Sequence, residues 1–195
     1  SLGYRVERCK LSCGDLGADH RRDRYWLLAV RDKSIFEKVS KHLTKLPRLN
    51  LQYWSQTPEQ VGEEVIVVNR RAQLKAIGNA QSPMVAASAF RILVNRHLTN
   101  KYHGILALKE EIDAVYESKK TWIKQTFGEQ FGYVHTPTTM ANYSAPSMMK
   151  HQGCRNFVTV FGKPTPHNAE YLMGFPIGAS SLTPLNTNNI EKWVY

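Results

Sequence analysis

The sequence predicts an α/β fold, because short segments typical of strands alternate with longer segments that have helical character. Residues 4–11 alternate polar and apolar side chains, which is typical of a strand. Residues 24–30 form a short apolar run preceded by turn residues, which indicates a buried strand. Residues 82–98 form a longer apolar run that opens on Ser-Pro, which indicates a buried helix.

Between the two strands, glycines at positions 14 and 17 predict a loop, and a helix is expected to follow the second strand. Ser34 and Glu37 have the spacing of a capping box. Apolar residues then recur at helical spacing until Pro47 ends the helix, namely Ile35, Val39, Leu43 and Leu46. Residues 65–68 form a further strand-like run.

Ser82 suits the N-cap of the 82–98 helix, and Pro83 suits its first turn because that position needs no N–H donor. A charged helical stretch is expected over residues 105–127. Residues 132–170 have weak periodicity and predict an irregular region dominated by loops, and residues 182–195 predict a short last helix.

The composition is that of a globular chain with a sizeable core: 195 residues, 42% apolar and 22% charged. No apolar run approaches the roughly 20 residues that span a bilayer, and no signal peptide is visible. The chain opens without a Met, as expected of a fragment. Cys9, Cys13 and Cys154 have neither disulfide-framework nor zinc-site spacing, which favours a reducing cytosol.

The net charge of +10 favours a polyanionic partner such as nucleic acid. Residues 1–50 hold 12 Lys and Arg against 6 Asp and Glu, so +6 of the excess lies there. The alternative is a solvated basic face without a partner.

Three arginines lie where the predicted loop enters the second strand, in "DLGADHRRDRYWLLA". Strand alternation places Arg22 and Arg24 on one side and Arg21 on the other. Two guanidinium groups on one face are costly without an anion or acceptor, and their planar fork suits phosphate or a base carbonyl. The alternative is a surface loop in which these arginines pair with Asp19 and Asp23.

A Gly-Asn turn is expected directly before the 82–98 helix, in "LKAIGNAQSPMVAASAF". The exposed N–H groups at a helix start either hold an anionic ligand or form a plain helix cap. Two aromatic pairs, Tyr53–Trp54 and Tyr25–Trp26, are candidates for stacking on a displaced base. Core packing is the alternative, and it is favoured for Tyr25–Trp26 because this pair begins the buried strand.

Three blocks of the sequence resemble DNA (cytosine-5) methyltransferases, in particular phage-type members. "GDLGADHRRDRYWLLA" resembles the block D-x-G-x-P-Q-x-R-x-R followed by an apolar strand. "LKAIGNAQSPMVAASAF" resembles the Gly-Asn block that opens a helix beside the S-adenosylmethionine pocket. "AEYLMGFPIG" resembles the block (E/R)-x-L-M-G-F-P-x-G. The three blocks cover under a third of the chain.

The resemblance implies a role for each block. Arg22 and Arg24 would be the catalytic arginines that approach the flipped cytosine and the DNA backbone, with Arg21 as a further DNA contact. The cofactor, S-adenosylmethionine, would be contacted at its amino-acid end by Gly78, Asn79, Ala80 and Gln81. Residues 172–176 would be structural and would organise the edge of the DNA-recognition region.

The chain also departs from the family pattern. His20 stands where the first block has Gln, and the Leu-Met-Gly-Phe-Pro block follows the Gly-Asn block instead of preceding it. The chain has no Pro-Cys nucleophile segment, no Glu-Asn-Val acid and no glycine-rich cofactor loop. These absences predict a C-terminal portion that is inactive as an isolated chain and shares S-adenosylmethionine with a missing N-terminal portion.

The fold implied is part of an S-adenosylmethionine-dependent, Rossmann-like methyltransferase sheet with a smaller, irregular DNA-recognition region. Residues 1–98 would be the C-terminal portion of the catalytic domain and residues 99–195 a target-recognition or accessory region. The expected partners are double-stranded DNA and the N-terminal half of the enzyme, with no membrane, in the cytoplasm of a bacterial or phage-infected cell. Part of a sheet exposes an edge and an apolar face, so self-association of the isolated chain is expected.

Two alternatives to this function remain at this stage. The chain could be a DNA-binding remnant, or the subunit of a split enzyme, that kept the basic face without the catalytic groups. It could also be a structural or interaction protein in which the Gly-Asn turn only caps a helix.

Overall fold

The computed structural model describes residues 2–43, 53–55, 69–99, 117, 120–121, 123–129, 131–139, 142–185 and 187. The expected strand at 65–68 lies outside these residues, as does most of the expected last helix at 182–195. Of the expected helix at 105–127, the described residues 117, 120–121 and 123–127 are helical.

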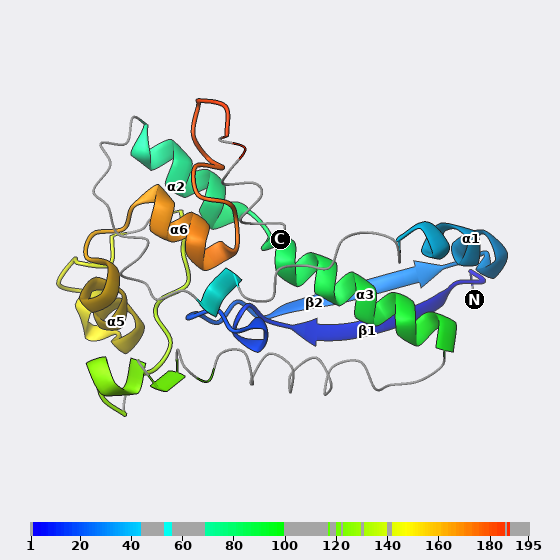
Figure 1. Cartoon of the computed structure of the whole chain (residues 1–195), viewed down its shortest axis with the longest axis horizontal. Helices are drawn as coiled ribbons and strands as arrows, with labels where there is room; N and C mark the ends of the chain where they lie inside the picture. Colours follow the sequence, from blue (N-terminus) through cyan, green and yellow to red (C-terminus); the bar gives the residue numbers. More distant parts are fainter. Residues whose placement is uncertain are drawn as a thin grey trace.

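An antiparallel hairpin forms the sheet of the described part of the chain (Figure 1). Strand β1 (Arg5–Leu11) pairs with β2 (Arg24–Val30) in a register that runs from Arg5 opposite Val30 to Leu11 opposite Arg24. Both predicted strands are therefore confirmed. The chain is a mixture of helix and strand, and the larger Rossmann-like sheet stays a prediction.

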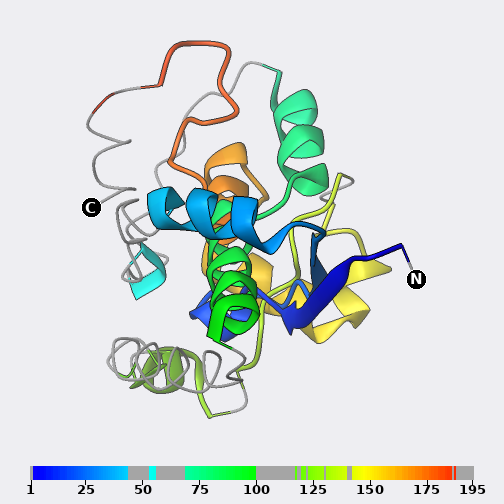
Figure 2. The same cartoon turned by 90° about the vertical axis from the view of Figure 1, so that its right-hand side faces the viewer.

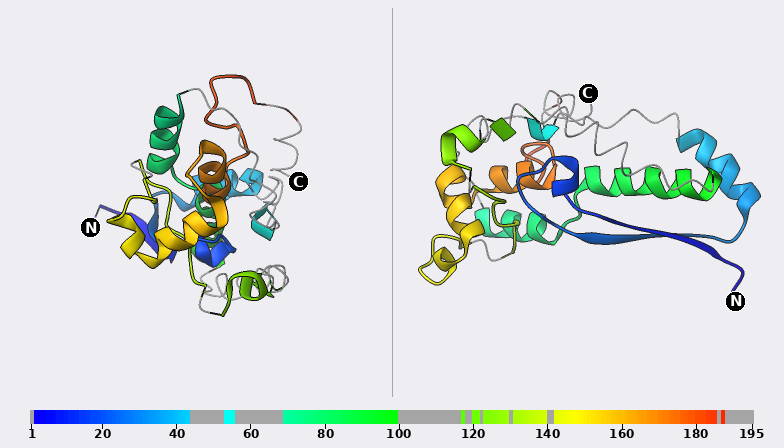
Figure 3. Two further views of the ribbon diagram at one scale, coloured as in Figure 1. Left: turned by 90° about the vertical axis from the view of Figure 1, so that its left-hand side faces the viewer. Right: turned by 90° about the horizontal axis from the view of Figure 1, so that it is seen from below.

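One face of the hairpin is covered by helix α3 (Pro83–Thr99), as the three views agree (Figures 1, 2 and 3). Cys9 and Leu11 of β1 are buried on this face, and Trp26 and Leu28 of β2 pack against the same core. This helix begins at Pro83, as the Ser-Pro signal predicted.

The other face of the hairpin is open within the described residues. Tyr25 is 79% exposed, Leu27 71% and Val6 54%. The expectation that residues 24–30 form a buried strand is therefore wrong for one of its two faces. Because this strand is apolar on both faces, the sequence pattern alone does not reveal which face is covered.

Helix α1 (Lys33–Leu43) follows β2. Its start differs from the predicted capping box, because the Asp32 carboxylate accepts hydrogen bonds from the N–H groups of Ser34 (2.9 Å) and Ile35 (3.2 Å). Asp32 therefore caps the helix two residues earlier than the sequence pattern suggested.

The remaining elements gather at the end of the hairpin that carries the β1–β2 connection (Figure 1). They are the short 3₁₀ turns η1 (Gly14–Leu16), η2 (Tyr53–Ser55) and η4 (Met148–Lys150), and the helices α2 (Arg70–Asn79), α5 (Gln152–Phe161) and α6 (Pro166–Met173). Helices α5 and α6 lie where residues 132–170 were expected to be irregular, so that expectation is wrong in part. Thr165 and Asn168 form a capping box at the start of α6, and Gly174 (φ 73°) ends the helix.

A single main core joins residues from both halves of the chain. Cys9 and Leu11 of the hairpin share it with Val134, Phe157 of α5 and Leu172 of α6. A smaller cluster joins α2 to α6. The division into residues 1–98 and 99–195 stays a prediction, and within the described residues the main core crosses that boundary. Among the described helices, none has the length and apolar character needed to cross a membrane.

Candidate functional site

The arginine block and the Gly-Asn block meet at one place in the structure. The Nη2 atom of Arg22 donates hydrogen bonds to the carbonyl oxygens of Ala80 (2.8 Å) and Gly78 (3.3 Å). These carbonyls lie at the C-terminal end of α2, where backbone acceptors lack partners within the helix and the helix dipole favours a cation. Arg22 therefore caps the C-terminus of α2 and links the α2–α3 connection to the segment just before β2.

The predicted Gly-Asn turn is instead the last turn of a helix. Gly78 and Asn79 end α2, and the connection to α3 consists of Ala80, Gln81 and Ser82. The N–H of Ala80 donates to the carbonyl of Ile77 (3.1 Å). The expectation that this segment forms a turn is wrong because glycine and asparagine are tolerated at a helix C-terminus as well as in turns. Of the four predicted cofactor contacts, only Ala80 and Gln81 lie in the connection that precedes α3.

The structure gives Gly78 a packing role. A Cβ atom at this position would lie 2.5 Å from the backbone carbon of Thr138 and 2.5 Å from the nitrogen of Thr139. The backbone of residues 138–139 therefore crosses α2 at a distance that only glycine permits.

His20 lies in the interior beside Arg22. It is 0% exposed, and neither ring nitrogen has a hydrogen-bond partner within the described residues. Its backbone forms a parallel bridge with Val134, which holds the loop before β2 against the 131–139 segment. Burial, assisted by the cationic Arg22, lowers the pKa of His20 to about 3, so the imidazole is neutral at physiological pH.

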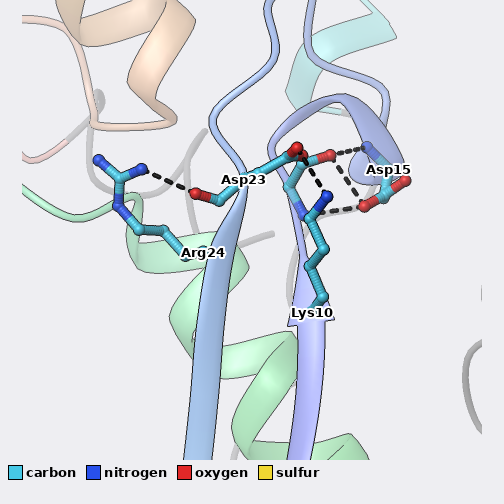
Figure 4. A network of polar contacts seen from close by, with 5 residues as sticks. Lys10, Asp15, Asp23 and Arg24 are labelled. Atoms are coloured by element: carbon cyan, nitrogen blue, oxygen red, sulfur yellow. Dashed lines mark hydrogen bonds and ion pairs between the residues drawn. The ribbon is translucent and has the colours of Figure 1, made fainter.

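The structure separates the three arginines as strand alternation predicted: Arg22 and Arg24 are partly buried and Arg21 is exposed. Arg24 donates to the neighbouring carbonyl of Asp23 (2.8 Å), its only hydrogen bond within the described residues. Figure 4 shows its side chain directed away from Lys10, which forms an ion pair with the Asp23 carboxylate at 2.8 Å. The Asp23 carboxylate thus pairs with a lysine and leaves the Arg24 guanidinium available to an external anion.

Arg21 lies over the ring of Tyr133, with its guanidinium carbon 5.6 Å from the ring centroid. The hydroxyl of Thr136 donates to the backbone carbonyl of Arg21, which ties the same loop to the 131–139 segment. No sequence pattern indicated Tyr133 or Thr136, because both lie in a stretch without periodicity.

The buried start of α3 offers a polar group without a partner. Ser82 is 2% exposed, and its hydroxyl lies beside the Cys13 thiol, where it acts to lower the pKa of that thiol. The hydroxyl has no hydrogen-bond partner of good geometry within the described residues. Ser82 therefore begins the helix without its side chain satisfying the N–H groups of the first turn. A small anion such as a carboxylate would suit these donors.

The three cysteines are buried, and burial raises the pKa of each of them. The pKa of Cys13 reaches about 11, despite the nearby cations of Arg22 and Arg24. At neutral pH all three are thiols, so none has the properties of an activated nucleophile. Within the described residues, no cluster of three or more His, Cys, Asp or Glu side chains is arranged to hold a metal ion.

The Leu-Met-Gly-Phe-Pro block packs against both helices of the Gly-Asn block. Met173 of α6 shares a buried cluster with Leu74 and Ile77 of α2. A Cβ atom at Gly174 would lie 2.8 Å from the Trp54 ring and 3.3 Å from the Met84 sulfur, so only glycine permits this contact.

A buried carboxylate organises the chain after α6. Glu170 is 0% exposed and accepts hydrogen bonds from the N–H groups of Gly178 and Ser180, both at 2.7 Å, and from the Ser180 hydroxyl. These bonds hold residues 175–180 in a fixed loop beside α2.

Tyr53 and Trp54 belong to the core and are not positioned to stack on a base. The Trp54 indole donates to the carbonyl of Tyr171 (2.8 Å), and the Tyr53 hydroxyl donates to the carbonyl of Phe175. Tyr25 has the exposed ring instead, although core packing was expected for the Tyr25–Trp26 pair.

No protein-family model, curated protein or solved structure matches this chain.

Proposed function

We propose that this chain is the C-terminal portion of a DNA (cytosine-5) methyltransferase that transfers a methyl group from S-adenosylmethionine to C5 of cytosine in DNA. A second polypeptide segment would supply the cysteine nucleophile, the acid and the main cofactor loop. The observation that carries the proposal is the bond from Arg22 to Ala80 and Gly78, which joins two of the three resembling blocks although they lie 58 and 56 residues apart.

The third block supports the same proposal, because its Met173 and Gly174 pack on α2 and α3. The three stretches that resemble the family are therefore neighbours in space. Chance similarity in three separate stretches would have no reason to bring them together.

The charges and surfaces agree with such a role. The net charge of +10 suits a DNA partner. Arg24 has a guanidinium available to a phosphate or a base carbonyl, whereas Arg22 has a positioning role. The open face of the hairpin, with Tyr25 and Leu27 exposed, would be covered by the missing portion of the enzyme.

Of the four residues first expected at the cofactor's amino-acid end, Gln81 remains the candidate nearest the start of α3, and Ser82 joins it. Gln81 and Ser82 precede the first turn of α3, and the Ser82 hydroxyl, which lies beside the Cys13 thiol, has no hydrogen-bond partner of good geometry within the described residues. When bound, S-adenosylmethionine would supply the methyl group. The start of α3 would hold the cofactor's carboxylate, and Arg24 would orient the displaced cytosine. Arg22 would fix the position of the cofactor site relative to the cytosine site.

A second candidate is a DNA-binding remnant without catalysis, which the buried, protonated thiols favour. The test is methyl transfer from labelled S-adenosylmethionine to duplex DNA, with this chain alone and with the polypeptide encoded immediately upstream. Activity only in the mixture supports the proposal. Salt-dependent DNA binding without activity in either sample supports the remnant.

Arg24→Gln tests the role of the available guanidinium. It should weaken DNA binding and reduce the number of counterions released on binding by about one. Arg31→Gln, which changes the arginine that directly follows β2, serves as the matched control. Unchanged binding in Arg24→Gln would contradict its assignment as a DNA contact.

A further inference from the structure

An open depression of about 610 Å³ lies on the exposed side of α2. Its volume is within the range of ligand-binding clefts. The described residues that line it include two cations and no carboxylate, namely Asn69, Arg71, Ala72, Lys75 and Thr139. This α2 depression therefore has the charge of a site for an anion.

One stripe of α2 carries both cations. Arg71, Lys75 and Gly78 follow one another at intervals of four and three residues, which places them on the same side of the helix. The buried residues Leu74 and Ile77 share a cluster with α6 instead. The packing of α2 on α6 therefore holds the stripe at the surface.

The segment 138–139 bounds one end of the stripe. A Cβ atom at Gly78 would lie 2.5 Å from the backbone of Thr138 and of Thr139, so this segment crosses the helix about one turn beyond Lys75. The N–H of Thr138 donates to the Tyr143 hydroxyl (3.0 Å), which holds the segment in place. The α2 depression is therefore bounded at this end by backbone in a fixed position.

The positions of the two cations are unfavourable for the helix itself. Arg71 lies in the first turn of α2, where the helix dipole favours an anion. Arg71 and Lys75 are like charges four residues apart, which repel each other. The helix contains no Asp or Glu, and neither cation has an ion-pair or hydrogen-bond partner within the described residues. An external anion would offset both costs.

We propose that the α2 depression binds the phosphate backbone of nucleic acid, with Arg71 and Lys75 each neutralising one phosphate group. The inference rests on the DNA partner of the proposed function and is independent of methyl transfer. Arg71 lies roughly 10 Å from Gly78 along the helix axis. Arg22 links the end of this helix to the segment that leads to Arg24, which fixes the position of the depression relative to the candidate site.

The experiment measures the affinity of the full chain for a fluorescent DNA duplex at several salt concentrations. Replacing both Arg71 and Lys75 with glutamine should reduce the number of counterions released on binding by about two. Between 50 and 200 mM salt, the variant should therefore lose about tenfold less affinity than the wild-type chain. An unchanged salt dependence in this variant would overturn the assignment.

The matched control replaces Arg31 and Lys33 with glutamine. It removes the same charge at the other end of the hairpin, where α1 begins (Figure 1). This control should leave the number of released counterions unchanged. An equal reduction in the control would show that the effect comes from the total charge of the chain, and would overturn the assignment to the α2 depression.

Thermal melting tests whether the two cations lack partners in the folded chain. Without DNA, the Arg71→Gln, Lys75→Gln variant should melt at no lower temperature than the wild-type chain, because the change removes a repulsion between like charges. DNA should raise the melting temperature of the wild-type chain more than that of the variant. A clearly lower melting temperature of the variant without DNA would show that the cations stabilise the fold, and would contradict the proposal.

The outcomes also separate this inference from the proposed function. Salt-dependent DNA binding that is the same in the wild-type chain and the Arg71→Gln, Lys75→Gln variant would overturn the phosphate contact alone. Reduced counterion release in the variant, together with no methyl transfer in any mixture, would overturn the proposed function and leave the phosphate contact standing. Binding to phosphatidylserine vesicles but not to DNA would overturn the choice of nucleic acid as the partner.

Discussion

Replacing His20 with glutamine is expected to remove a pH dependence of stability that the buried imidazole creates. His20 is 0% exposed, and burial together with Arg22 lowers its pKa from 6.5 to about 3. Above pH 6.5 the imidazole is neutral in both the folded and the unfolded chain. As the pH falls below 6.5, the unfolded chain binds a proton that the folded chain does not bind until about pH 3, so the free energy of unfolding decreases.

The size of the effect follows from the two pKa values. Between about pH 7.5 and about pH 5, the unfolded state gains about 2 kcal/mol from protonation of one histidine with a pKa of 6.5, while the folded state gains almost nothing. His97 also has a pKa lowered by burial and acts in the same direction. The prediction is therefore the difference between the wild-type chain and His20→Gln, because His97 is present in both.

Urea unfolding followed by circular dichroism at several pH values measures this difference. The variant should lose about 2 kcal/mol less stability than the wild-type chain over this pH interval. Its stability at neutral pH should be lower, because the amide brings additional polar groups into a site without hydrogen-bond partners among the described residues. Equal losses in the two proteins would show that the folded chain protonates His20 readily, and would refute its burial as a neutral group.

Three further changes test the packing of the candidate site. Gly78→Ala should destabilise the fold by about 1–3 kcal/mol in urea unfolding, because its Cβ would lie 2.5 Å from the backbone of residues 138–139, whereas Gly132→Ala has open space and should change stability little. Glu170→Gln should cost about 1.5–3 kcal/mol in the same assay, since charge-assisted hydrogen bonds become neutral ones inside the core. Leu27→Lys should reduce self-association in sedimentation velocity, because it places a charge in the open apolar face; undiminished association would locate the contact elsewhere.

Local signals in the sequence predicted the elements that depend on local interactions. The hairpin strands and the start of α3 at Pro83 lie where alternation and the Ser-Pro pair placed them. Helix α5 was missed because its sequence is rich in β-branched and polar residues, whose helical state depends on Cys154 and Phe157 packing into the core. The exposure of one hairpin face also depends on which other elements cover it, and a continuous apolar run carries no information about that.

The sequence predicted the arginines and the Gly-Asn block of the candidate site, but it did not predict the long-range contacts that they make. Alternation separated Arg21 from Arg22 and Arg24, and the structure has the same division. The role of Gly78 depends on the backbone of residues 138–139, about 60 residues along the chain, and no local pattern indicates such a contact. The same holds for Tyr133, which lies beside Arg21 and Gly14 only in the folded chain, more than 100 residues away from both in the sequence.

The different environments of Arg22 and Arg24 determine how the two residues can act. Arg24 begins β2 and Arg22 lies in the segment just before it, and only Arg22 reaches the carbonyls that end α2. The Arg22 guanidinium donates to two partly buried backbone carbonyls, and it would have to break both hydrogen bonds to bind a phosphate through the same nitrogen. This loss of hydrogen bonds opposes its use as a DNA contact. Arg24, bonded only to the carbonyl of Asp23 within the described residues, has no such cost. Substituting Arg22 should therefore affect function through the position of the α2–α3 connection and substituting Arg24 through direct contact, so the loss of stability should accompany the first and not the second.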